Sequence, residues 1–196
     1  MSKQYRTMLD MKNAYEQIRV IPEHVPRMTV TTPDGNMVNH VMQQGDCNAP
    51  TTHQALMNHL FSAYIGRIMD IYLDDIIIYS DSLDDHVRHV KLVLDILKRE
   101  KLYLSRSKFH FMPPEMKLLG RIIDDQGICM DPTKVDSILN WKVPTNCDLL
   151  RVFIGSVGYL ADDKPNIRIP MGVLSAITGI QFHFVGGILN SEPLMK

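Results

Sequence analysis

The sequence predicts an α+β fold in which an antiparallel sheet carries helices on one face. The first observation behind this prediction is the order of the expected elements, which run strand, helix, hairpin, helix, hairpin, helix and then further strands. The second is a pair of hairpin signals, at Asp34-Gly35 and at Asp74-Asp75. The third is composition: 45% of the residues are hydrophobic and 22% are charged, as in ordinary globular domains, so disorder is not expected.

The N-terminal elements follow from local signals. Residues 7–9 are expected to form a short strand that ends at Asp10, and residues 13–19 a short helical stretch. Residues 27–32 and 37–43 flank a D-G turn and are expected to form a hairpin. Pro50 then opens a predicted helix that extends to about residue 65, because Pro is favoured in the first turn of a helix.

Two strongly apolar runs, at residues 68–73 and 76–79, predict a second hairpin with Asp74 and Asp75 between its strands. Apolar residues then recur at steps of four and three, at Leu83, Val87, Val90, Leu94 and Leu97. This spacing predicts an amphipathic helix of several turns.

The C-terminal elements are shorter. They are expected to be two strands, at residues 109–112 and 118–123, and two helices, at residues 132–141 and 148–160. Asp131 is predicted to cap the first of these helices, with Pro132 at its first position. The chain beyond Asp162 is rich in Gly, Pro and Ile and predicts no defined element.

The candidate chemistry lies in three carboxylates. Asp74 and Asp75 interrupt an aliphatic stretch, where their like charges repel and a divalent cation would remove the conflict. The alternative is a hairpin turn that happens to use two Asp residues, although tight hairpins prefer Gly. Asp10, taken alone, is most simply a helix N-cap. A two-metal site needs carboxylates from separate elements around ions about 3.5–4 Å apart, and the three residues together predict one.

Five motifs occur in a characteristic order: Asp10 to Tyr15, Gln44-Gly45 with Asn48-Ala49-Pro50, Tyr72-Leu73-Asp74-Asp75, Leu104 to Lys108, and Leu118-Leu119-Gly120. Together they resemble the polymerase motifs of gypsy-type LTR-retrotransposon reverse transcriptases. The resemblance runs from about Tyr5 to about Trp141, and more weakly to Phe184. Each motif alone is a weak signal, but their joint occurrence is specific.

The resemblance implies an RNA-directed DNA polymerase core that transfers a nucleotidyl group from a dNTP to a primer 3′-hydroxyl. Asp10, Asp74 and Asp75 would hold two Mg²⁺ ions, for which Mn²⁺ can substitute. One ion would activate the primer hydroxyl and the other would neutralise the triphosphate. The implied partners are an RNA or DNA template with its primer and a dNTP, with no membrane, and either a homodimer or a parent polyprotein.

The same resemblance assigns the substrate-binding residues. Tyr15 would lie under the deoxyribose and exclude a 2′-hydroxyl, the alternative being a core aromatic residue. Gln44 would lie beside the incoming nucleotide, where many members of the family carry an aromatic residue instead. Lys108 would neutralise or protonate the leaving pyrophosphate, the alternative being a lysine that faces solvent. Leu119-Gly120 would belong to a hairpin that grips the primer.

Several other polar residues have ordinary interpretations. A basic cluster comprises Lys98, Arg99, Lys101, Arg106 and Lys108. It could follow a phosphate backbone, but Lys98 and Arg99 are expected on a solvated helix face. His86 and His89 are expected at the surface beside the apolar stripe, and Asp162-Asp163 in a loop at a helix end.

By the resemblance, residues 1–124 are expected to form a palm with truncated fingers. Residues 125–164 are expected to form a thumb-like helical segment, and residues 165–196 the start of a connection toward an RNase H domain. Only nine residues precede Asp10, so a fragment or a decayed or domesticated copy is expected. Such a remnant, which would bind nucleic acid or protein without catalysis, is the alternative function. The retained carboxylates favour the enzyme, and the truncated fingers favour the remnant.

Charge and cysteine content limit the classes of function and the cellular locations that the sequence allows. The formal net charge of −1 argues mildly against a nucleic-acid binder that relies on overall charge, although a local basic patch could serve. Cys47, Cys129 and Cys147 form no C-x-x-C pair, so neither a disulfide framework nor a cysteine zinc site is expected. An intracellular location is therefore expected, with a cytoplasmic particle and the nucleus both left open.

Overall fold

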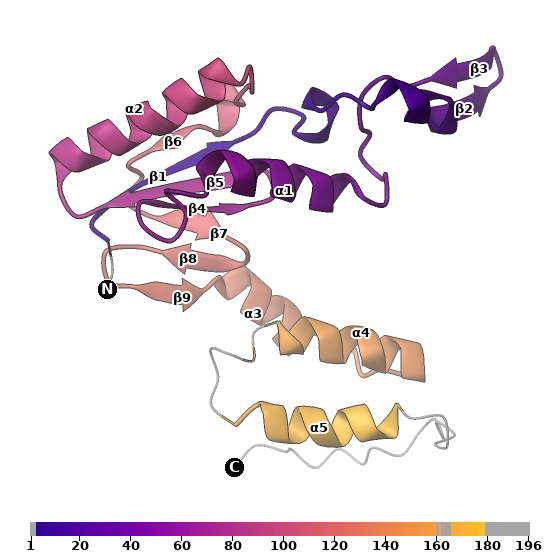
Figure 1. Cartoon of the computed structure of the whole chain (residues 1–196). Helices are drawn as coiled ribbons and strands as arrows, with labels where there is room; N and C mark the ends of the chain where they lie inside the picture. The colour runs from indigo at the N-terminus through magenta and orange to yellow at the C-terminus, as the bar shows by residue number, and fades with distance from the viewer. Residues whose placement is uncertain (1–2, 160, 162–165, 179–196) are drawn as a thin grey trace. The chain divides into compact units, whose positions relative to one another are not determined.

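The computed structural model describes residues 3–159, 161 and 166–178 (Figure 1). The chain divides into two compact units, Met1–Met116 and Lys117–Lys196. The first unit contains a mixed arrangement of helices and antiparallel strands, so the predicted α+β class is confirmed. No helix in these described ranges is long and apolar enough to cross a membrane.

A four-stranded antiparallel sheet forms the centre of the first unit. Its strands, in order across the sheet, are β4 (Met69–Tyr72), β5 (Asp75–Ser80), β1 (Tyr5–Asp10) and β6 (His110–Phe111). β1 and β5 pair from Tyr5 opposite Ser80 to Asp10 opposite Asp75. Because β1 has a partner strand on each side, the position of Asp10 at its end is well fixed.

The other elements of this unit connect or cover the sheet. They are the helices α1 (Ala49–Phe61) and α2 (Leu83–Arg99), the hairpin β2 (Thr29–Thr32) and β3 (Gly35–Val38), and the 3-10 helices η1 (Tyr15–Gln17), η2 (Pro22–Met28) and η3 (Arg106–Lys108). The helical stretch expected at residues 13–19 is therefore only a short 3-10 turn.

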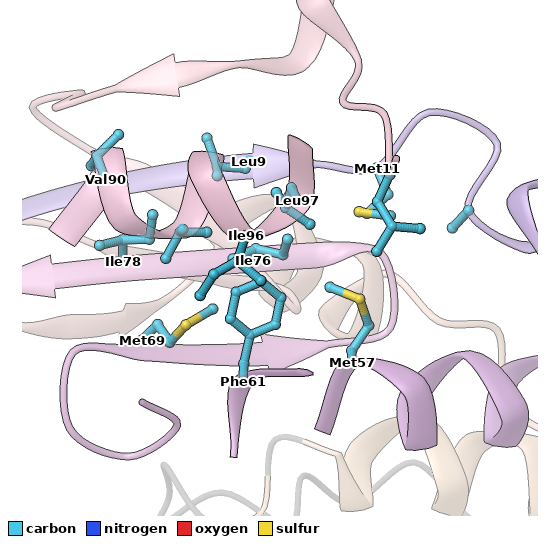
Figure 2. Close-up of a cluster of buried hydrophobic side chains, with 13 residues drawn as sticks. Leu9, Met11, Met57, Phe61, Met69, Ile76, Ile78, Val90, Ile96 and Leu97 are labelled. Atoms are coloured by element: carbon cyan, nitrogen blue, oxygen red, sulfur yellow. The ribbon is translucent and has the colours of Figure 1, made fainter. Parts of the chain in front are cut away.

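The hydrophobic core lies on one face of the sheet, as the sequence predicts. Leu9 pairs with Ile76 across β1 and β5, and both side chains are fully buried. Phe61 of α1 and Leu97 of α2 belong to the same buried cluster (Figure 2). Because side chains alternate along a strand, Asp10 and Asp75 point to the opposite face from Leu9 and Ile76. Burial of each large apolar side chain in this cluster contributes about 1.5–3 kcal/mol.

The sequence of α2 explains both its start and its end. Ser82 is the N-cap, and its hydroxyl accepts a hydrogen bond from the Asp85 amide at 3.2 Å. Asp84 in the first turn and Arg99 in the last turn complement the helix dipole. The predicted helix is confirmed, but the predicted apolar stripe is partly wrong, because Leu83 and Val87 are exposed. The buried face is formed instead by His86, Val90, Val93, Ile96 and Leu97.

The prediction that His86 lies at the surface is wrong. Its ring is completely buried between α2 and the sheet, and Nε2 lies 2.8 Å from Thr7 Oγ1 while Nδ1 lies 3.0 Å from Ser80 Oγ. His89 is only half-buried, and its Nδ1 lies 2.8 Å from the same Ser80 hydroxyl. An imidazole can be buried here because the neighbouring strands supply hydroxyl partners for both of its nitrogens.

Among the described residues from 116 onward, the elements are a small sheet and three helices. They are β7 (Met116–Leu118), β8 (Arg121–Ile123), β9 (Ile128–Met130), α3 (Pro132–Leu139), α4 (Cys147–Gly158) and α5 (Arg168–Ile177). Asp131 caps α3 as predicted, because its carboxylate accepts a hydrogen bond from the Thr133 amide at 2.9 Å.

Three differences from the sequence prediction occur in this part. The single strand expected at residues 118–123 is two strands, because Leu119 and Gly120 adopt φ values of 47° and 70° and turn the chain. Strand β9 was not predicted, and α5 forms where no element was expected. Asp162-Asp163 and Phe184 lie outside the described residues.

Candidate active site

Carboxylates that are far apart in the sequence meet at one end of the central sheet. Asp10 is the last residue of β1 and lies opposite Asp75, the first residue of β5. Just beyond this pair, the Met11 amide donates a hydrogen bond of 3.0 Å to the Asp74 carbonyl. Asp10 is only 6% exposed, whereas Asp74 and Asp75 are half-buried. The strand register thus brings together the three predicted metal ligands.

Asp74 lies in the tight turn that joins β4 and β5. Tyr72 pairs with Asp75, so Leu73 and Asp74 are the two turn residues. Leu73 has φ = 53°, whereas Asp74 is not among the described residues with positive φ. Two-residue hairpins usually place Gly where this backbone conformation is required. The turn that presents Asp74 is therefore built on a strained leucine.

Lys108 provides a cation that contacts a carboxylate of the site. Its Nζ lies 3.0 Å from Asp10 Oδ2, and its side chain is 63% exposed while that of Asp10 is 9% exposed. The Ser105 amide donates a 2.8 Å hydrogen bond to the Asp10 carbonyl, so the segment that carries Lys108 is attached directly to the end of β1. The hydrogen bond with Asp10, followed by the negative charge of Asp10, raises the pKa of Lys108. Lys108 is exposed, but it is also an ion-pair partner of a predicted ligand.

The carboxylates interact electrostatically. Burial raises the pKa of Asp75, the charges of Asp74 and Asp10 raise this pKa further, and the charge of Lys108 opposes the shift. Carboxylate oxygens are the donors that Mg²⁺ prefers, so this set of residues fits such an ion chemically. Within the ranges that the structure describes, however, no three ligand-type side chains are gathered into a ready-made metal cluster. The negative charge of Asp10 is instead balanced by the ion pair with Lys108.

A cavity of about 350 Å³ adjoins this end of the sheet. It is lined by five of the six predicted site residues: Asp10, Tyr15, Gln44, Asp74 and Lys108. Asp75 is not among the lining residues. The backbone turn at Lys12 and Asn13 also lines the cavity and was not singled out from the sequence.

Tyr15, the first residue of η1, and Gln44, in the segment between β3 and α1, both line the cavity. Tyr15 is half-buried, and its ring meets the His53 ring edge-on, with centroids 5.8 Å apart. Tyr15 therefore lines the cavity and also packs against α1, and its contact with a deoxyribose stays a prediction. Gln44 is exposed, and the Asp46 carboxylate orders its loop by accepting a 2.7 Å hydrogen bond from the Gln43 amide.

The sequence prediction missed His53. This residue is completely buried, and neither of its ring nitrogens has a hydrogen-bond partner among the described residues. Burial lowers the pKa of His53, and the charge of Asp74 partly opposes this shift. The signal was available, because Ala49, His53, Met57 and Phe61 form a buried stripe at steps of four.

The residues of the basic cluster do not share one site in the described structure. Lys98 and Arg99 are exposed at the end of α2, and Arg99 Nε lies 2.9 Å from Glu100 Oε1, as a solvated helix face predicts. Arg106 is exposed and lines a second cavity beside the first. Only Lys108 of this cluster lines the carboxylate cavity.

Comparison with known proteins gives consistent matches. The family model for reverse transcriptase (RNA-dependent DNA polymerase) matches residues 1–123. The chain is 34% identical over 163 residues to the Retrovirus-related Pol polyprotein from transposon 297 of Drosophila melanogaster, a match that covers 83% of this chain and 15% of the polyprotein. It is 36% identical over 154 residues to the Transposon Tf2-3 polyprotein of Schizosaccharomyces pombe, which corresponds to 79% of this chain and 12% of that protein. The chain thus spans a small part of these relatives.

Solved structures match the fold. A foamy viral protease-reverse transcriptase in complex with double-stranded DNA gives a TM-score of 0.80 at 20% identity, and the match covers 90% of this chain and 31% of that one. The complex of the same kind of protein with an RNA/DNA hybrid gives a TM-score of 0.78 at 20% identity, covering 91% and 24%. This likeness shows a palm-like α+β fold, which confirms the predicted fold class.

Proposed function

Because the chain belongs to the reverse transcriptase family, we propose that the cavity at Asp10 and Asp74 is the nucleotidyl-transfer site of a retrotransposon RNA-directed DNA polymerase. The observation that supports this most directly is the β1–β5 register, which sets Asp10 opposite Asp75 with Asp74 beside them. The same arrangement does not favour a non-catalytic remnant, since a packed fold that merely persisted would not need three carboxylates at one end of its sheet.

Asp10 and Asp74 are the residues that would hold two Mg²⁺ ions, or Mn²⁺, with Asp75 next to them. When bound, these ions would activate the primer 3′-hydroxyl and neutralise charge on the triphosphate. A lysine side chain is protonated at neutral pH, and the contact with Asp10 raises the pKa of Lys108 further. Lys108 can therefore supply positive charge, or a proton, to the leaving pyrophosphate.

The remaining cavity residues would select and position the nucleotide. The half-buried ring of Tyr15 would lie under the deoxyribose and leave no room for a 2′-hydroxyl. The exposed amide of Gln44 would contact the incoming dNTP. A template–primer duplex of RNA or DNA would lie across the site, and the matched foamy viral structures hold double-stranded DNA or an RNA/DNA hybrid, which supports this partner.

The first test is metal binding by Asp74→Asn. We expect Mn²⁺ affinity, measured by titration calorimetry, to fall at least tenfold, or about 1.4 kcal/mol, because one carboxylate donor is lost. Without metal, the free energy of unfolding should hold or rise slightly, because the repulsion that raises the pKa of Asp75 is relieved.

Asp95→Asn is the matched control, because Asp95 is exposed on α2. Its Mn²⁺ affinity should equal that of the wild type. Primer extension on an RNA template with Mg²⁺ should likewise be impaired by Asp74→Asn and not by Asp95→Asn. Equal Mn²⁺ affinity in the two variants would contradict the proposed site.

A further inference from the structure

We propose that Gln54 of α1 is a positioning residue that holds the Leu73–Asp74 turn in the conformation that directs Asp74 into the cavity. The inference deepens the proposed function and rests on it for the role of Asp74. Gln54 does not line the cavity, so it would act only through the turn.

The turn requires support because of its backbone conformation. Leu73 has φ = 53°, and a branched side chain in this left-handed region crowds its own backbone. Such a conformation persists when surrounding contacts determine it more strongly than the local preference opposes it. In this turn the next residue is Asp74, so the conformation of Leu73 sets the direction of that carboxylate.

Gln54 supplies contacts of the required kind. Its Oε1 accepts a hydrogen bond from the Leu73 amide at 2.8 Å, and its Nε2 donates to the Ile71 carbonyl at 3.3 Å. Nε2 also donates to Asn58 Oδ1 at 2.9 Å, which orients the amide so that Oε1 faces Leu73. One side chain thus satisfies a backbone donor and a backbone acceptor on either side of Tyr72.

The anchor itself is rigid. α1 buries Met57 and Phe61 in the hydrophobic cluster, so the position of Gln54 is tied to this core. His53, which precedes Gln54 in α1, packs against the Tyr15 ring. α1 therefore supports the cavity at two points, one behind the predicted sugar contact and one behind the turn.

The chemistry of the contact predicts a graded set of variants. Gln54→Glu keeps the acceptor for the Leu73 amide but loses the donor to Ile71. Gln54→Leu loses both. Leu73→Gly removes the steric cost of positive φ, so the turn would then hold its conformation without Gln54.

The experiment measures hydrogen exchange of the Leu73 amide and Mn²⁺ affinity on the same proteins. In Gln54→Leu, we expect exchange of this amide to accelerate at least tenfold and Mn²⁺ affinity to fall several-fold. Gln54→Glu should lie between this variant and the wild type. Adding Leu73→Gly to Gln54→Leu should restore Mn²⁺ affinity while the amide still exchanges rapidly, which a general loss of stability would not produce.

Gln126→Leu serves as the control, because Gln126 is exposed in the turn between β8 and β9 and belongs to the second unit. It should change neither quantity. If Gln54→Leu left Leu73 exchange and Mn²⁺ affinity unchanged while Asp74→Asn lost Mn²⁺ binding, the positioning proposal would be overturned and the proposed function would stand. If the wild-type chain bound no Mn²⁺, the proposed function would fail, and Leu73 exchange alone would decide whether Gln54 holds the turn.

Discussion

The buried imidazole of His53 shows what a single residue can cost the fold at this site. Both ring nitrogens are buried without a hydrogen-bond partner among the described residues, and the ring contacts Tyr15 edge-on. An unpaired buried polar group costs about 1–3 kcal/mol. The His53 ring therefore provides a packing surface for Tyr15, but its unpaired nitrogens lower the free energy of unfolding.

We expect His53→Phe to increase the free energy of unfolding at pH 7.5 by about 1–2 kcal/mol, because it keeps an aromatic ring and removes the unpaired nitrogens. Urea unfolding followed by circular dichroism measures this change. His59→Phe is the control, since His59 is exposed on the same helix and should change stability by no more than about 0.5 kcal/mol. A loss of stability in His53→Phe would mean that the imidazole has a polar partner after all.

At the scale of elements, a chain of hydrogen bonds ties α2 to the sheet. The Met112 amide donates to Thr7 Oγ1 at 3.3 Å, and His86 lies between the hydroxyls of Thr7 and Ser80. Ser80 also contacts His89. With His86 neutral, Thr7 can donate to His86 Nε2, His86 Nδ1 can donate to Ser80, and Ser80 can donate to His89 Nδ1, so each of these three contacts joins one donor to one acceptor. Protonation of His86 would break this order.

This network predicts acid sensitivity. Burial, and then the charge of His89, lower the pKa of His86 below its ordinary value of 6.5. The unfolded chain therefore binds more protons than the folded chain as the pH falls below 6.5, so stability is full above that value and declines below it. The slope approaches about 1.4 kcal/mol per pH unit for one proton.

Urea unfolding between pH 7.5 and 5.5 tests this, with His53→Phe as the background so that the other buried imidazole does not titrate. In that background, His86→Gln should be less stable at pH 7.5 but should show a flatter pH dependence. Equal slopes with and without His86 would contradict the assignment.

Capping residues, turn residues and apolar spacing predicted most of the helices and strands, but they did not predict every buried residue or every turn. The spacing of apolar residues predicted α2, but His86 was left out of the apolar set, so the predicted stripe was turned toward Leu83 and Val87. The break at Leu119 was missed by the local pattern, although the resemblance placed Leu119-Gly120 in a hairpin, because a non-glycine residue with positive φ is imposed by tertiary structure.

The candidate site was predictable to a similar degree. The sequence marked Asp74 and Asp75 because adjacent carboxylates interrupt an aliphatic stretch, and it marked Asp10 only as their partner in a two-metal site. The strand register then sets Asp10 opposite Asp75. Gln54 carried no such signal. Its importance depends on the φ of Leu73 and on the packing of α1, and neither is encoded in a local pattern.

At the scale of the whole molecule, the hydrophobic core belongs to the first unit. Every member of the buried cluster, and every residue packed against it, lies between Leu9 and Leu104. Strand β6, which ends at Phe111, completes the edge of the sheet. About 100–150 residues is also the common size of an independent domain.

We therefore expect a chain that ends after Met116 to unfold cooperatively, with protected amides in β1 and β5. Thermal unfolding and hydrogen exchange measure this. A chain that ends after Arg99 is the comparison, since it lacks Leu102, Leu104 and β6, and it should lose cooperativity. A non-cooperative transition in the longer chain would show that the second unit is needed for the first to fold.

The pairing of β1 with β5 also limits how this chain can gain or lose residues during evolution. Deleting one residue between Tyr5 and Leu9 would move Asp10 to the face that holds the core, and would carry an apolar neighbour to the cavity. A two-residue deletion would leave Asp10 on the same face of the sheet but would change the β5 residue with which it pairs. The exposed β2–β3 hairpin bears no such restriction, so length variation should accumulate there and be purged from β1.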